Sequence, residues 1–146
     1  MKFSQQVRLP VSRRDAWMLL NDVSVLQPCI PGCELLRAVS SDEFDVTITV
    51  PMGLTDVRLP GKIRLRDVDP ARSYTLQVES AAGQGQAEAR VQLESSGENE
   101  TLLRYTARIT VGGLIATFGA PLWNKIARRL AQEFFKAFVE RIRQPS

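Results

Sequence analysis

The stretch from Phe44 to Asp69 reads FDVTITVPMGLTDVRLPGKIRLRDVD. Apolar side chains occupy every second position on both sides of a turn at residues 51–53, Pro-Met-Gly. A period of two is typical of a strand with one buried face, and a tight turn between two such strands predicts an antiparallel pair. The stretch therefore predicts a long β-hairpin.

The same alternation continues outward from this hairpin. It covers residues 2–9 and runs from Cys33 to Val111, with turn sequences at Asp67-Val68-Asp69-Pro70 and Gly97-Glu98-Asn99. We therefore expect seven antiparallel strands with one apolar face. The opposite face carries Arg58, Lys62, Arg64 and Arg66 on the fourth strand. Hydration explains such a charged face, and an anion-binding surface is the alternative.

Two short helices are predicted between the first and second strands. Ser12 is a suitable N-cap with Asp15 three residues later, and Asp22 or Ser24 would cap a second helix that ends before Pro28. These helices would connect the first strand to the remaining six.

The C-terminal segment has a helical period. Pro121 predicts that this helix kinks or begins afresh at that residue. The apolar stripe is Trp123, Ala127, Leu130, Phe134 and Phe138, and the opposite side is Lys125, Arg128, Arg129, Gln132 and Lys136. Residues 1–146 are thus expected to form one α+β domain, with a curved seven-stranded antiparallel sheet wrapped around a long C-terminal helix.

Composition excludes several function classes. The 146 residues include no histidine, which rules out a Ser-His-Asp or Cys-His catalytic unit and a His-containing zinc site. The net charge is only +3, with 19 Lys and Arg against 16 Asp and Glu, and no basic run is present. We expect no nucleic-acid partner, because such proteins carry clustered basic patches.

The two cysteines lie in the segment Cys29-Ile30-Pro31-Gly32-Cys33. They lack two further ligands for a metal, so no metal site is expected. Two small apolar side chains beside a tight turn are the favoured interpretation, and a disulfide stays open.

No signal-peptide core precedes the first strand, and no apolar run approaches the ~20 residues that cross a bilayer. We expect a cytoplasmic protein. Small residues, Ala87 and Ala89 on one strand and Gly112, Gly113 and Gly119 before the last helix, leave space between sheet and helix. Either Trp123, Phe134 and Phe138 fill that space, or a ligand does.

The sequence resembles the CoxG family of carbon monoxide dehydrogenase subunits over nearly its whole length. The resemblance is carried by Asp15-Ala16-Trp17, Leu20-Asn21-Asp22, Cys29-Ile30-Pro31-Gly32-Cys33-Glu34, Gly61-Lys62-Ile63-Arg64, Asp67-Val68-Asp69-Pro70, Val111-Gly112-Gly113-Leu114 and Phe134-Phe135. It implies the START-like, helix-grip fold of the SRPBCC superfamily, whose members enclose an apolar cavity between a curved sheet and the C-terminal helix.

The resemblance also implies a non-catalytic accessory protein of a molybdenum hydroxylase. Such a protein would bind a quinone such as menaquinone, or a lipid, without a metal or covalent cofactor, and would help recruit the enzyme to the membrane or deliver its electron acceptor. Some relatives carry a membrane-anchoring C-terminal segment, whereas this sequence stops at Ser146. We therefore expect either transient contact with the inner face of the cytoplasmic membrane or a soluble carrier.

An apolar ligand needs a long apolar tunnel with few polar groups. The residues predicted to line it come from the short helices, a hairpin tip and the last helix: Met18, Ile30, Met52, Leu54, Phe118, Leu122, Trp123 and Ile126. Two alternatives remain. A START-like cyclase or hydrolase would use buried members of Asp22, Glu34, Asp56 and Tyr105, and a purely protein-docking adaptor would use the face of Arg58, Lys62, Arg64 and Arg66.

Overall fold

A computed structural model describes residues 1–51, 53–81, 85–112 and 119–144. Its strands and helices alternate as the sequence predicts, with two helices after the first strand and one after the last. In chain order they are β1 (Lys2–Leu9), α1 (Arg13–Leu20), α2 (Val23–Cys29), β2 (Cys33–Ala38), β3 (Glu43–Pro51), β4 (Asp56–Asp69), β5 (Ser73–Ser80), β6 (Gly85–Gly97), β7 (Glu100–Val111) and α4 (Ala120–Arg143).

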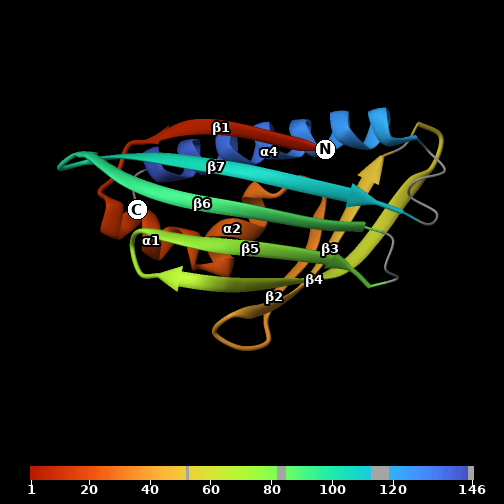
Figure 1. Cartoon of the computed structure of the whole chain (residues 1–146), viewed down its shortest axis with the longest axis horizontal. Helices are drawn as coiled ribbons and strands as arrows, with labels where there is room; N and C mark the ends of the chain where they lie inside the picture. The colour runs from red at the N-terminus through yellow and green to blue at the C-terminus, as the bar shows by residue number, and fades with distance from the viewer. Residues whose placement is uncertain (52, 82–84, 113–118, 145–146) are drawn as a thin grey trace.

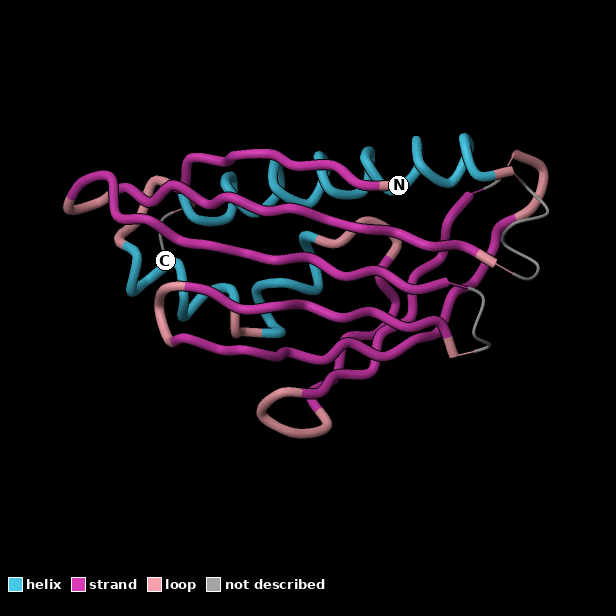
Figure 2. Tube along the Cα trace, in the orientation of Figure 1, coloured by secondary structure: helices cyan, strands magenta, loops and turns pink. Residues whose placement is uncertain are grey.

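The strands form one curved antiparallel sheet in the order β1-β7-β6-β5-β4-β3-β2. Strands β2 to β7 follow one another in space as in sequence, and β1 joins the sheet by pairing with β7. Figure 1 shows α1, α2 and α4 on the concave side of this sheet, and Figure 2 shows the strands curling around them. The predicted α+β class and helix-grip arrangement are confirmed.

The predicted caps begin both short helices. The amide of Asp15 donates to Ser12 Oγ at 3.2 Å, and the amide of Ser24 donates to Asp22 Oδ1 at 3.0 Å. The prediction that α2 ends before Pro28 was wrong, because the helix continues through Pro28 to Cys29. The helix can continue because the amide of Ile30 donates to the carbonyls of Leu26 and Gln27.

The last helix begins at Ala120, with Pro121 in its first turn, where the missing amide proton costs no helical hydrogen bond. Its apolar stripe faces inward, and Phe138 is completely buried. Lys125 and Arg128 on the opposite side are exposed. The part of the helical prediction that covers residues 113–118 lies outside the described residues.

Both cysteines are free thiols. Cys29 is buried and its Sγ donates to the carbonyl of Val25 at 3.3 Å, whereas Cys33 is half-buried and its Sγ donates to the carbonyl of Leu35. Burial raises the pKa of both thiols, which keeps them protonated and unreactive. Gly32 between them has a φ of +69° and lies against the backbone of Thr49, so it provides the predicted tight turn.

Candidate ligand-binding site

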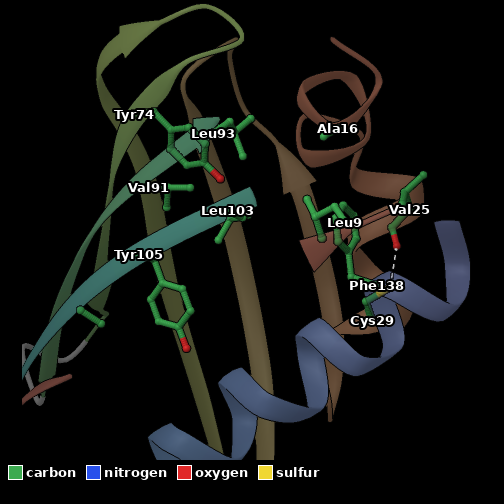
Figure 3. Close-up of a cluster of buried hydrophobic side chains, with 11 residues drawn as sticks. Leu9, Ala16, Val25, Cys29, Tyr74, Val91, Leu93, Leu103, Tyr105 and Phe138 are labelled. Carbon is green, nitrogen blue, oxygen red and sulfur yellow. Dashed lines mark hydrogen bonds between the residues drawn. The ribbon is translucent and has the colours of Figure 1, made fainter. Parts of the chain in front are cut away.

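The concave face of the sheet is built from cross-strand rows of inward side chains. One row joins Tyr74, Val91 and Tyr105 on β5, β6 and β7, and the next joins Leu93 to Leu103. All five side chains are buried. We call this region, with Leu9 and Phe138, the packed end. Figure 3 shows it closed by Ala16 of α1, Val25 and Cys29 of α2, and Phe138 of α4.

A second row lies farther along the same strands. It joins Ile63, Val78, Ala87 and Ile109 on β4 to β7. These side chains alternate in register with the buried ones, so they point to the same concave side. All four are only half-buried, and none belongs to the cluster of packed core residues. We call this row the open end, because its apolar side chains keep contact with solvent.

Helix α4 crosses both ends. Over the packed end its aromatic rings fill the interior: Phe134 stacks on Phe138 with centroids 5.6 Å apart, and Phe135 stacks on Tyr105 at 5.2 Å. Toward the helix N-terminus, Trp123 is buried, but Ile126 and Leu130 are half-buried. The interior is therefore filled by side chains at the packed end and lined by partly exposed apolar groups near the start of α4.

One polar pair stands on the concave face near the rings of α4. The hydroxyl of Tyr105 donates to Gln5 Oε1 at 3.0 Å. Burial raises the pKa of this tyrosine, and desolvation raises the pKa of the buried Tyr74 even further. Both phenols are therefore neutral at physiological pH.

The predicted lining residues lie in different environments. Met18 on α1, Leu54 in the β3–β4 hairpin and Leu122 in the first turn of α4 are exposed. Ile30 and Ile126 are half-buried. Trp123 is buried, with 6% of its surface exposed. Met52 and Phe118 lie outside the described residues.

The predicted lining residues also come from opposite ends of the molecule. Figure 1 places α1, and therefore Met18, at one end of the molecule, and the β3–β4 hairpin of Leu54 at the other end, where α4 begins. Leu122, Trp123 and Ile126 lie together on the first turns of α4. Their role in binding a ligand stays a prediction. Sequence reasoning did not single out Ile63, Val78 and Ile109, although their alternation had already assigned them to the apolar face.

The candidate catalytic groups are not brought together. Asp22 caps α2, and its carboxylate accepts from the Ser24 hydroxyl at 2.6 Å, which lowers the pKa of Asp22. Glu34 pairs with Arg58 at 3.0 Å on the surface, and Asp56 is exposed at the start of β4. Of the four candidates only Tyr105 lies inside.

Membrane spans and metal clusters are both missing from the described residues. None of the helices among them is long enough and apolar enough to cross a bilayer. The same residues contain no group of three or more acidic or cysteine side chains placed to hold a metal ion.

A family model of the CoxG subunit of carbon monoxide dehydrogenase matches residues 6–143. The chain belongs to this family. Membership places it among accessory subunits associated with a carbon monoxide dehydrogenase. No curated protein matches this CoxG-family chain.

Solved structures support the same fold for this CoxG-family protein. A conserved protein from Geobacillus kaustophilus is 26% identical, with a TM-score of 0.86 over 97% of this chain and 95% of that one. A START superfamily protein from Mycobacterium smegmatis is 16% identical, with a TM-score of 0.64 over 97% and 96%. The Zhui aromatase/cyclase from Streptomyces is 13% identical, with a TM-score of 0.72 over 97% and 93%. At this identity the last two show the START-like fold alone.

Proposed function

We propose that this CoxG-family protein binds an apolar ligand, a quinone such as menaquinone or a lipid, between its sheet and the first half of α4. It would act without catalysis of its own, as an accessory to a molybdenum hydroxylase of the carbon monoxide dehydrogenase type. Bound quinone would serve as the enzyme's electron acceptor, and exchange of the ligand with the membrane would recruit the enzyme there.

The open end is the observation that carries this proposal. Four inward apolar side chains, Ile63, Val78, Ala87 and Ile109, keep solvent contact, although β5, β6 and β7 bury their inward side chains at the packed end. Leaving apolar surface in water costs about 25 cal/mol per Å². A ligand that covers these side chains would recover that free energy, which is the driving force that a quinone or isoprenoid receptor uses.

The polarity of the interior supports the same ligand class. Among the described residues, the buried polar side chains on the concave side, Tyr74, Tyr105 and Thr101, are uncharged. Such an interior favours molecules without charge. A quinone fits it because its ring carries only carbonyl acceptors and its tail carries none.

The test is reconstitution of the full-length chain with menaquinone, followed by quenching of tryptophan fluorescence and native mass spectrometry. The variant Ala87→Phe places a ring inside the open end, and the control Gln86→Phe places the same ring on the outer face of the same strand. We expect Ala87→Phe to weaken menaquinone binding at least tenfold and Gln86→Phe to leave it within twofold. Equal affinity of both variants, or no uptake by the wild type, would contradict the proposal.

A further inference from the structure

The outer face of the sheet is hollowed on the side opposite to the helices. Two adjoining cavities, of about 300 and 230 Å³, share Glu88 and Arg108 and extend from β4 across to β1. More cations than carboxylates line the two cavities. The cations are Lys2, Lys62, Arg64, Arg66, Arg90 and Arg108, and the carboxylates are Glu79 and Glu88.

Part of this charge is already neutralised within the chain. Lys62 lies 3.4 Å from Glu43, and Arg64 lies 3.9 Å from the same carboxylate. Arg90 instead donates to the hydroxyls of Thr75 and Ser73, at 3.1 and 2.9 Å.

Three cations keep their charge available. Arg66, Arg108 and Lys2 are exposed, and none has an ion-pair or hydrogen-bond partner for its side chain within the described part of the chain. The register places Lys2 directly opposite Arg108 on the neighbouring strand. Glu88 lies opposite Arg108 on its other neighbouring strand, and no ion pair joins the two side chains in the described part of the chain. The hollow therefore presents positive charge at Arg66, Arg108 and Lys2 that no ion pair neutralises.

From this geometry we propose that the outer hollow docks an acidic surface of a partner protein. The inference deepens the proposed function, since the partner it fits is the molybdenum hydroxylase. Guanidinium groups bind carboxylates through paired hydrogen bonds, so a row of arginines suits Asp and Glu side chains. β4 and β7 lie three strand spacings apart, about 14 Å, so the cations extend over a length that suits several carboxylates of a protein surface.

The face does not suit a membrane. The large apolar side chains that are exposed in the described residues, such as Leu54 and Leu122, do not line either cavity. A membrane-binding surface inserts such groups, whereas a polar, hollowed face meets another protein's protruding charges. Docking here leaves the helices uncovered on the other side of the sheet (Figure 1), while Val78 and Ala87 of the open end also line the larger cavity from within the sheet.

The test measures binding of the full-length chain to the purified molybdenum hydroxylase of the same organism. The variant Arg66→Glu/Arg108→Glu reverses two unpaired cations of the hollow. The control Arg14→Glu/Arg143→Glu makes the same change in net charge at exposed arginines of α1 and α4. We expect the first to raise Kd at least tenfold and the second less than twofold. Arg66→Gln/Arg108→Gln, a milder change, should fall between them, and urea midpoints check that all variants fold.

Equal Kd values for the two charge reversals, or no binding of the hydroxylase by the wild type, would overturn the docking proposal. Binding to phosphatidylglycerol vesicles would also overturn it, if the vesicles bound the wild type, did not bind Arg66→Glu/Arg108→Glu, and displaced the hydroxylase from the wild type. Menaquinone binding is measured on the same samples. If the hydroxylase binds through the hollow but menaquinone does not bind, the ligand proposal fails while the docking surface stands.

Discussion

The packed end and the open end share β5, β6 and β7 and the same alternation, yet they differ in what covers them. Val91 at the packed end is 6% exposed, whereas Val78 on the adjacent strand of the open end is half-buried. Three helices meet over the first region, and only the beginning of α4 approaches the second among the described elements. One sheet can therefore supply both a stabilising core and a surface left for a ligand.

Stability and function are expected to separate along the strands. Side chains of the packed end should carry most of the free energy of unfolding, because they are fully desolvated. Side chains of the open end should contribute little until a ligand covers them. Substitutions at the two ends should therefore differ in their effect on unfolding.

Phe138→Ala is expected to be the most damaging substitution. This ring is completely buried and stacks on Phe134, so its removal loses transfer free energy and leaves a cavity. We expect the free energy of unfolding to fall by about 3–5 kcal/mol. Urea denaturation followed by circular dichroism measures it. A loss below about 1 kcal/mol would mean that the packed end is not the centre of the core.

A matched pair of valines compares the two ends directly. Val91→Ala should cost about 2 kcal/mol because the side chain is buried, and Val78→Ala should cost less than about 1 kcal/mol because its side chain already contacts water. Urea midpoints of the wild type and both variants, measured without ligand, give the two losses of stability to be compared. Equal losses would remove the distinction between the ends.

Tyr105→Phe removes one hydroxyl from the edge of the packed end and keeps the ring stacked on Phe135. The hydrogen bond to Gln5 is lost, so we expect a loss of about 1 kcal/mol. Thermal unfolding measures it, with Tyr105→Leu as a control that also removes the ring stacking. If Tyr105→Phe were as damaging as Tyr105→Leu, the hydroxyl would matter more than the ring.

The smallest expected change in stability concerns Asp22, the N-cap of α2. The hydrogen bond from the Ser24 hydroxyl lowers the pKa of Asp22 in the folded chain, so ionised Asp22 stabilises the fold above its unfolded pKa near 3.8. This contribution is lost as the pH falls through the lowered pKa. Asp22→Ala should therefore unfold at a slightly lower temperature at pH 7, and the gap should close near pH 2. A gap that persisted in acid would point to a cause other than ionisation.

Much of the fold follows from the sequence because its signals are local. Alternation in β3 and β4, the caps at Ser12 and Asp22, and Pro121 in the first turn of α4 each act over a few residues. The predicted end of α2 at Pro28 was wrong because a proline in the last turn removes only one hydrogen bond. The amide of Ile30, after this proline, still donates to helical carbonyls.

The candidate site was harder to predict for a physical reason. Alternation assigns a side chain to a face, but it does not tell how deeply distant elements cover that face. Val78 and Val91 have the same pattern in sequence, and only the positions of α1 and α2 separate them. Alternation did assign Lys62, Arg64 and Arg66 to the charged outer face, but the hollow that joins them to Lys2, Arg90 and Arg108 forms only where the strands meet in the sheet.

The open end should receive an apolar ligand while the packed end does not change. Methyl NMR during titration with menaquinone tests this division directly, with isoleucine, leucine and valine methyls labelled. We predict shifts at Ile63, Val78 and Ile109 and none at Val91, Leu93 or Leu103. Shifts confined to the packed end, or no shifts at saturating menaquinone, would contradict it.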